Sequence, residues 1–282
     1  MFFYTYGHFD EEGYPTSEDF FSNENSLQYL KNFNNDLHTN FNFYEISNQF
    51  VEHIGYYHGD NKFCDDSINQ EVIDEMGNSM YVTRIKALRL GKNMCLTFKN
   101  NILEGRNFVE SDYSITGPEE EVSAILGSDY QGIYQVGDVI ETSLLNKSVK
   151  LKVIGFFKPN TAYLKKELLF QELPSKNSLD QLIVMPYYDI LYEPTDEADA
   201  LYQKRYYTQR NSGYIKVEDG LNCDKYIQQA KELTSLTQEE GFSYTCPPEY
   251  IYYKNMVEAV ASKENVPYSI SFSAIELTFP DK

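Results

Sequence analysis

Between residues 53 and 66 the sequence gathers side chains that can bind a metal ion. They are two imidazoles, one thiol and three carboxyls: His53, His58, Asp60, Cys64, Asp65 and Asp66. A zinc site needs three or four such groups converging at about 2.0–2.3 Å. Their spacing matches neither the HExxH motif nor the paired ligands of zinc fingers. We therefore expect an acidic, solvated loop over 58–66 that holds no metal. Equilibrium dialysis against zinc would distinguish such a loop from a zinc site.

A second group of ionisable side chains surrounds Arg106. Glu104, Glu110 and Asp112 flank it in the sequence. Two carboxyls can act as general acid and base when their environments drive their pKa values apart. An arginine between them favours ion pairing instead, so we expect Arg106 to hold Asp112 or a backbone carbonyl in a structural role.

The glycines and serines of the chain give no sign of catalysis. Gly105, Gly137 and Gly155 belong to neither a GxGxxG nor a Walker A loop, so we predict no nucleotide site and no cofactor. They are expected to serve turns or close backbone packing. No GxSxG elbow is present either, and we predict no catalytic residue.

Residues 186–207 are unusually rich in tyrosine. A peptide or a sugar could stack on such rings if they were exposed. The alternative is that they are half-buried and cover a sheet edge. The candidate binding surface consists of Tyr187, Tyr188, Tyr192, Tyr202, Tyr206 and Tyr207.

The composition restricts the class of protein. The chain has 282 residues, 41% of them hydrophobic, so it can bury a sizeable core. Its formal net charge of −19 repels phosphate backbones, which makes nucleic acid a poor partner. The sequence has no apolar run of 18 residues and no signal peptide pattern at Met1. Three pairings are open to its four cysteines, which we expect as buried thiols: Cys64, Cys95, Cys223 and Cys246.

Periodicity predicts alternating strands and helices along the chain. The expected strands are 2–6, 41–57, 79–88, 138–144, 148–157, 182–187, 214–218, 242–246 and 268–279, with an apolar run at 122–126. The expected helices are 24–39, 161–170, 223–240 and 249–262. Residues 58–78 are expected as a loop, and 188–212 as an exposed excursion. Together these elements predict a mixed α/β (α+β) fold.

The stretch from Asn101 to Phe157 resembles the extracytoplasmic domain of ABC transporter permeases of the MacB/FtsX type. That family has a leucine-rich turn, then Gly-Arg, a Phe and an Asp, an apolar strand, a helix, and Val-Gly before a hairpin that ends in Val-(Ile/Val)-Gly, and each feature has a counterpart here. The resemblance is strong over 101–157, moderate over 178–250 and weak over the first 90 residues. The counterparts that form this structural motif are Gly105, Arg106, Phe108, Asp112, Gly137, Asp138 and Gly155.

The resemblance implies a fold of two lobes. A porter-like subdomain of two strand-helix-strand units would be built from 1–104 and 179–282. A small α/β subdomain would be inserted between them over 105–178.

The resemblance also implies a function that is not enzymatic. Such domains couple cytoplasmic ATP hydrolysis to export, extraction or signalling outside the membrane. The implied partners are a cytoplasmic ATPase subunit and a second permease, reached through the membrane helices of the full-length protein, and a peptide or extracellular protein. The chain would then be a soluble excised domain from the extracytoplasmic side of the cell membrane, and its composition hints at a Gram-positive bacterium.

Two alternatives from other classes remain open at this point. The first is a secreted peptide- or glycan-binding protein, which flanking membrane helices in the parent gene would contradict. The second is an extracellular hydrolase, for which the sequence offers no convergent polar pocket.

Overall fold

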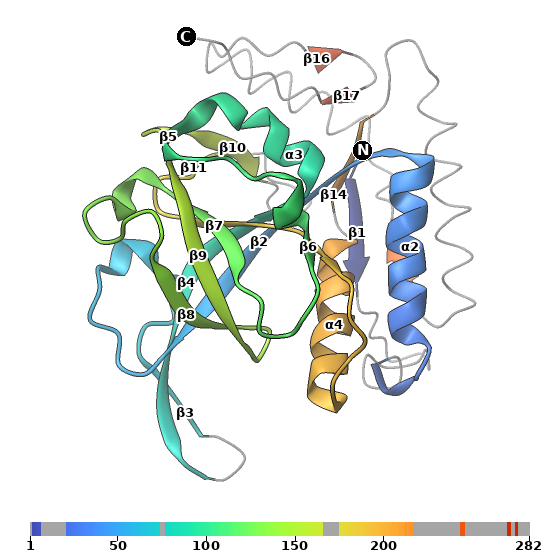
Figure 1. Cartoon of the computed structure of the whole chain (residues 1–282), viewed down its shortest axis with the longest axis horizontal. Coiled ribbons are helices and arrows are strands. Elements are labelled where there is room, and N and C mark those ends of the chain that lie inside the picture. Colours follow the sequence, from blue (N-terminus) through green and yellow to red (C-terminus); the bar gives the residue numbers. More distant parts are fainter. Residues whose placement is uncertain are drawn as a thin grey trace. The chain divides into compact units, whose positions relative to one another are not determined.

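A computed structural model describes residues 2–6, 21–73, 77–165, 175–211, 213–216, 243–245, 270–271 and 274–275. The chain divides into two compact units. Unit 1 comprises Met1–Glu45, Lys166–Ser175 and Gln203–Lys282, and unit 2 comprises Ile46–Lys165 and Lys176–Tyr202. Both units mix helices and strands (Figure 1), which confirms the predicted α/β class.

The sheet of unit 1 is antiparallel and draws its strands from both ends of the chain. Its order is β15 (Ser243–Thr245), β1 (Phe2–Tyr6), β14 (Gly213–Lys216) and the start of β2 (Asn42–Ile54). All four strands overlap segments that the sequence predicts as strands. Two short strands of the same unit, β16 (Ile270–Ser271) and β17 (Ala274–Ile275), form a separate antiparallel pair.

Helix α2 (Ser26–Asn40) confirms the helix predicted at 24–39. Its buried apolar side chains are Leu30, Phe33 and Leu37, which recur at helical spacing and form one face. The helix ends where the Phe41 N–H donates to the Leu37 carbonyl at 3.1 Å and the backbone of Phe41 becomes extended.

Helix α4 (Glu197–Arg210) occupies the segment that we expected as an exposed excursion, and this expectation is wrong. Asp196 begins the helix, because its Oδ1 accepts the Asp199 N–H at 2.8 Å. Glu197 and Asp199 lie in the first turn, where negative charge complements the helix dipole. The unit boundary falls within α4, between Tyr202 and Gln203.

In the described part of unit 2, six strands close into a mixed β-barrel (Figure 1). Around the ring the strands are β2, β8 (Val139–Leu144), β9 (Lys147–Phe157), β7 (Val122–Leu126), β12 (Ile183–Pro186) and β4 (Ser79–Leu90), and β4 pairs with β2 to close it. The β7–β9 and β12–β4 pairs are parallel, and the other four are antiparallel. Outside the ring, β3 (Gln70–Ile73) pairs with β4 and β5 (Ile102–Gly105) pairs with β9.

The core of unit 2 follows from the composition of its central strands. All four residues of β12 are buried, which is typical of a strand with a parallel neighbour and no solvent-facing side. β9 alternates exposed and buried residues from Ser148 to Val153, and its last four residues are all buried. The hairpin predicted at 138–157 is therefore present as β8 and β9, and its turn residues Leu145 and Asn146 have positive φ.

Short elements fill the remaining connections. They are α3 (Lys92–Thr97), the parallel pair of β6 (Ser114–Ile115) with β13 (Asp189–Ile190), β10 (Ala162–Lys165), β11 (Ser175–Ser178), and the 3-10 turns η1 (Asn61–Phe63), η2 (Lys99–Asn101), η3 (Glu110–Tyr113) and η4 (Ser128–Tyr130). The helix expected over 161–170 is a strand in its described part, where β10 pairs with β11. The helices expected at 223–240 and 249–262 lie outside the described residues. None of the helices in the described ranges combines the length and apolar character that a membrane crossing requires.

The boundaries of the two units differ from those that the sequence suggests. We placed an insert at 105–178, but β7, β8 and β9 of that segment share a ring with β2, β4 and β12. The observed boundary lies within β2, between Glu45 and Ile46. The reason is physical: strands far apart in the chain pair through backbone hydrogen bonds, and local sequence patterns carry no record of which strands will pair.

Candidate functional site

The Arg106–Asp112 ion pair lies where the chain leaves β5. The two guanidinium nitrogens Nη1 and Nη2 donate to Asp112 at 2.6 and 3.0 Å, which is the bidentate geometry of a strong pair. The same carboxylate accepts the Val109 N–H and the Ser123 hydroxyl, both at 2.6 Å. Burial raises the pKa of Asp112, but these hydrogen bonds and the charge of Arg106 lower it below its ordinary value. The group therefore fastens the loop to β7 and has the structural role expected of Arg106.

The glycines of the motif allow β5 to approach β9. Gly105 has φ +78°, and a Cβ there would lie 2.2 Å from the Ile154 carbonyl oxygen. Gly155 stands directly opposite, and its Cβ would lie 2.7 Å from the Glu104 oxygen. Both positions therefore exclude side chains for steric reasons.

The remaining motif residues also have structural roles, in backbone turns or in the packing of aromatic rings. Gly137 has φ +102°, which suits glycine. The Asp138 carboxylate accepts the Gln135 N–H at 2.9 Å and fixes the turn before β8. The Phe108 ring meets Tyr113 edge-on, with centroids 6.2 Å apart.

The candidate metal ligands at 53–66 do not converge. Asp60 begins η1 by accepting the Lys62 N–H at 2.9 Å, and Cys64 is buried. His58 packs on Tyr56 at 4.9 Å between ring centroids, and His53 on Tyr57 at 5.6 Å. Over the described ranges, no group of three or more His, Cys, Asp or Glu side chains is arranged to hold a metal ion.

The cysteines that the structure describes are free thiols. Cys64 and Cys95 are both buried and unbridged. Burial raises the pKa of Cys64 above its ordinary value. The other two cysteines, Cys223 and Cys246, lie outside the described residues.

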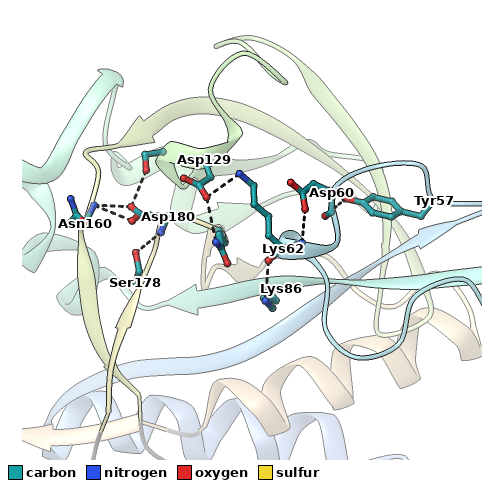
Figure 2. A network of polar contacts seen from close by, with 10 residues as sticks. Tyr57, Asp60, Lys62, Lys86, Asp129, Asn160, Ser178 and Asp180 are labelled. Atoms are coloured by element: carbon teal, nitrogen blue, oxygen red, sulfur yellow. Dashed lines mark hydrogen bonds and ion pairs between the residues drawn. The ribbon is translucent and has the colours of Figure 1, made fainter.

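A polar network joins several loops of unit 2, and sequence reasoning missed it (Figure 2). The Lys62 ammonium pairs with Asp129 at 3.2 Å, and Lys86 donates to the Lys62 carbonyl at 3.0 Å. The Asp180 carboxylate accepts the Ser128 hydroxyl at 2.9 Å and the Asn160 N–H at 2.9 and 3.1 Å. The network ties loops far apart in the sequence to one another, so no local pattern could reveal it.

Five of the six tyrosines proposed as a binding surface are buried, so that proposal is wrong as stated. Tyr187, Tyr188, Tyr202, Tyr206 and Tyr207 are at most 4% exposed. Tyr202, Tyr206 and Tyr207 lie on α4, and Tyr187 and Tyr188 lie in the connection between β12 and β13. Only Tyr192 is half-buried.

Two of these tyrosines instead line a hollow on unit 2. It is small: the space open to water is about 20 Å³, which is enough for about one water molecule. Tyr188 and Tyr202 share a hydrogen bond between their hydroxyls at 2.9 Å, and the Lys147 ammonium lies 4.8 Å from the centre of the Tyr202 ring. The lining residues are Ile115, Pro118, Glu119, Glu120, Val122, Lys147, Ser148, Val149, Lys150, Tyr188 and Tyr202.

The charge of Lys147 is fixed by its neighbours. Its ammonium pairs with Asp199 at 2.5 Å and donates to the Tyr192 hydroxyl at 2.8 Å. Burial lowers the pKa of Lys147, but these hydrogen bonds and charges raise it above its ordinary value. Asp199 and Tyr192 therefore hold Lys147 as a cation beside the hollow, which has room for about one water molecule.

Unit 1 contains a separate buried ionic cluster around Glu45. Its Oε1 accepts from Arg210 Nε at 2.6 Å and from His38 Nε2 at 3.1 Å, and Asn34 lies at 3.4 Å. Burial raises the pKa of Glu45, but the charge of Arg210 and the contacts with His38 outweigh it and lower the pKa to about 2. The cluster joins α2, β2 and α4.

No protein-family model and no curated protein matches the chain. Function therefore has to be argued from the residues and the fold.

Proposed function

We propose that the chain is the extracellular domain of an ABC transporter permease of the MacB/FtsX type. It would act without catalysing a reaction, by coupling cytoplasmic ATP hydrolysis to export, extraction or signalling outside the membrane. Its partners would be the ATPase subunit and a second permease, reached through membrane helices of the full-length protein.

The layout of the chain is the observation that carries this proposal. Unit 1 draws on both chain ends, and unit 2 is formed mainly by the stretch between them. In outline this is like the porter-like subdomain with an insert that the resemblance implies, but unit 2 also takes in residues 46–104 and 179–202, which the resemblance assigns to the porter-like subdomain. The resemblance itself rests on the motif around β5 and β9, where Gly105 pairs with Gly155.

A mechanical role is supported by the elements that pass from one unit into the other. The chain crosses the boundary four times: within β2, between Lys165 and Lys166, within β11 and within α4. In unit 1 the Glu45–Arg210 pair fastens β2 to α4, and both side chains are less than 10% exposed. Two of the four crossings therefore lie in elements that a buried ion pair holds together.

The first experiment tests the side of the membrane on which the domain lies. We would express the complete gene in its native host with Leu191→Cys in a background without other cysteines, because Leu191 is 64% exposed. A membrane-impermeant maleimide should label intact cells. The matched control is Met185→Cys, a fully buried position that should react only after denaturation. Labelling confined to lysed cells would contradict the proposal.

The second experiment tests the partner. The full-length protein, solubilised in detergent, should co-purify with an ATP-binding subunit whose ATP hydrolysis changes on association. Recovery of the protein from the culture medium without such a subunit would instead support the alternative, a secreted peptide- or glycan-binding protein. The exposed rings of Tyr56 and Tyr81 are the observation that favours this alternative.

A further inference from the structure

The hairpin of β3 and β4 leaves one strand edge open. β3 is the last strand in the order of the sheet, and within the described residues it pairs only with β4. In the part of the chain that the structure describes, the backbone N–H and C=O groups at its outer edge therefore have no strand partner. Such an edge is a template on which another strand can add.

One face of this hairpin is unusually apolar for a surface. Glu71 stands opposite Tyr81 and Ile73 opposite Ser79, and residues two apart on a strand share a face. Ile73 is 75% exposed and Tyr81 is 41% exposed. Tyr56, at 56% exposure, meets Tyr81 edge-on with centroids 5.4 Å apart. The face thus offers two aromatic rings and an aliphatic side chain to solvent.

A carboxylate lies within this apolar face. Glu71 is exposed and accepts a hydrogen bond from the Ser79 hydroxyl. An arginine or lysine can stack on an aromatic ring and pair with a neighbouring carboxylate at the same time. The formal net charge of −19 attracts a cationic partner from a distance. The chemistry of the face therefore complements a segment with both cationic and apolar side chains.

We propose that the β3 edge and this face receive an extended, cationic segment of a protein partner, which adds to the sheet as a strand beside β3. Backbone hydrogen bonds to β3 supply affinity, and alternate side chains of the segment meet Glu71, Tyr81 and Ile73. The inference goes beyond the proposed function, because it holds whether the domain is membrane-anchored or secreted. A glycan could also stack on Tyr56 and Tyr81, but it would use neither the open strand edge nor the charge of Glu71.

The probe is a fluorescent peptide of about ten residues that alternates arginine and valine. Its binding to the 282-residue protein is measured by fluorescence anisotropy at about 0.15 M salt. We expect Glu71→Gln to weaken binding about threefold, as for an exposed ion pair, and Tyr81→Ala about fivefold. The matched control is Glu141→Gln, which makes the same charge change at an exposed residue of β8 and should leave affinity unchanged.

Hydrogen exchange separates strand addition from adherence to an acidic surface. The bound peptide should slow exchange of the β3 amides, and a peptide that is N-methylated at every residue should not. Equal losses in Glu71→Gln and Glu141→Gln, or β3 amides that remain unprotected, would overturn the proposal. Displacement of the peptide by cellohexaose would overturn it as well, because the face would then be a glycan site.

Discussion

Gly105 and Gly155 face each other across the β5–β9 pair, and neither has room for a Cβ atom. Substitution by alanine at Gly155 would bring a methyl group against two backbone oxygens, those of Glu104 and Arg106, which cannot move without breaking the pair. The close approach of these two paired strands thus explains Gly105 and Gly155.

We expect Gly155→Ala to lower the free energy of unfolding by at least about 2 kcal/mol, as for other strained backbone positions. Urea denaturation followed by circular dichroism measures this. Gly117→Ala is the matched control, since nothing lies within 4 Å of its added Cβ, and it should change stability by less than about 0.5 kcal/mol. Equal effects of the two substitutions would show that the close approach is not limiting.

Arg106 offers a second prediction at this scale. Its side chain is 46% exposed, so water screens part of its pairing with Asp112. We expect Arg106→Ala to cost about 1 kcal/mol in urea denaturation, and Asp112→Ala about 2 kcal/mol, because the Val109 and Ser123 donors also lose their acceptor. Lys152→Ala removes a pair in which both partners are at least 41% exposed, and should be close to neutral. A larger loss for Lys152→Ala than for Arg106→Ala would contradict this account.

At the scale of elements, the barrel of unit 2 is weakest where β2 meets β8. The backbone register gives a single pair there, Glu52 with Ser143. Side chains complete the seam: the Thr142 hydroxyl donates to the Glu52 carbonyl at 3.0 Å, and the Ser143 hydroxyl lies 3.4 Å from the Glu52 carboxylate. Closure of the ring therefore depends on side chains as much as on the backbone ladder.

Thr142→Val should open this seam. The substitution keeps the shape of the side chain and removes its hydroxyl, which leaves the half-buried Glu52 carbonyl without that donor and costs about 1 kcal/mol. The readout is hydrogen exchange, which should accelerate in β8 and not in β7 or β12. Thr142→Ser retains the hydroxyl and should preserve the slow exchange of β8. If exchange is unchanged in Thr142→Val, the Thr142 hydroxyl does not hold β8 against β2.

The ionic cluster around Glu45 should make the stability of the fold depend on pH. The folded pKa of about 2 lies below the ordinary value of 4.5, so the cluster contributes its full stability above pH 4.5. That contribution, about 3 kcal/mol, is lost as the pH falls from 4.5 through 2. Glu45→Gln should therefore be much less stable than the wild type at neutral pH, and the gap should narrow in acid. A constant gap across this pH range would contradict the linkage.

Local sequence patterns predicted most of the elements in the described residues. The periodic apolar positions of α2 and the alternation of β4 and β9 are properties of short segments. Such local patterns are sufficient to predict these elements. α4 was missed because its inward face is built from tyrosines among charged residues, so it resembles a polar surface segment. β3 was missed because its four residues lie in an acidic stretch.

The candidate sites were predictable only where their residues are close in sequence. Arg106 and Asp112 are six positions apart, and charge alone made Asp112 one of the two expected partners of Arg106, the other being a backbone carbonyl. The partners in the Lys62–Asp129 pair and in the hollow of Lys147 and Tyr202 come together only through the pairing of distant strands. Residue types alone cannot supply that pairing.

For the whole molecule, the net charge of −19 is the dominant electrostatic fact. Like charges repel more strongly in the compact state than in the expanded one, and salt screens this repulsion. Raising salt from about 0.05 to about 0.5 M at neutral pH should increase the free energy of unfolding by about 1 kcal/mol. The control is the same measurement near the isoelectric point of about 4.6, where the increase should vanish. Destabilisation by salt at neutral pH would show that attractive pairs dominate.

The order of strands in the barrel has a consequence for how the protein is made. β12 (Ile183–Pro186) lies between β7 and β4, so the ring cannot close before it arrives. A ribosome finishes β12 about 130 residues after β2, which takes roughly ten seconds at ordinary elongation rates. During that interval the nascent chain carries β7 and β4 with open edges. β12 is the last strand of the ring to be synthesised, so it sets the earliest moment at which the barrel of unit 2 can close. Until then a chaperone or a translocation channel has access to an incomplete barrel.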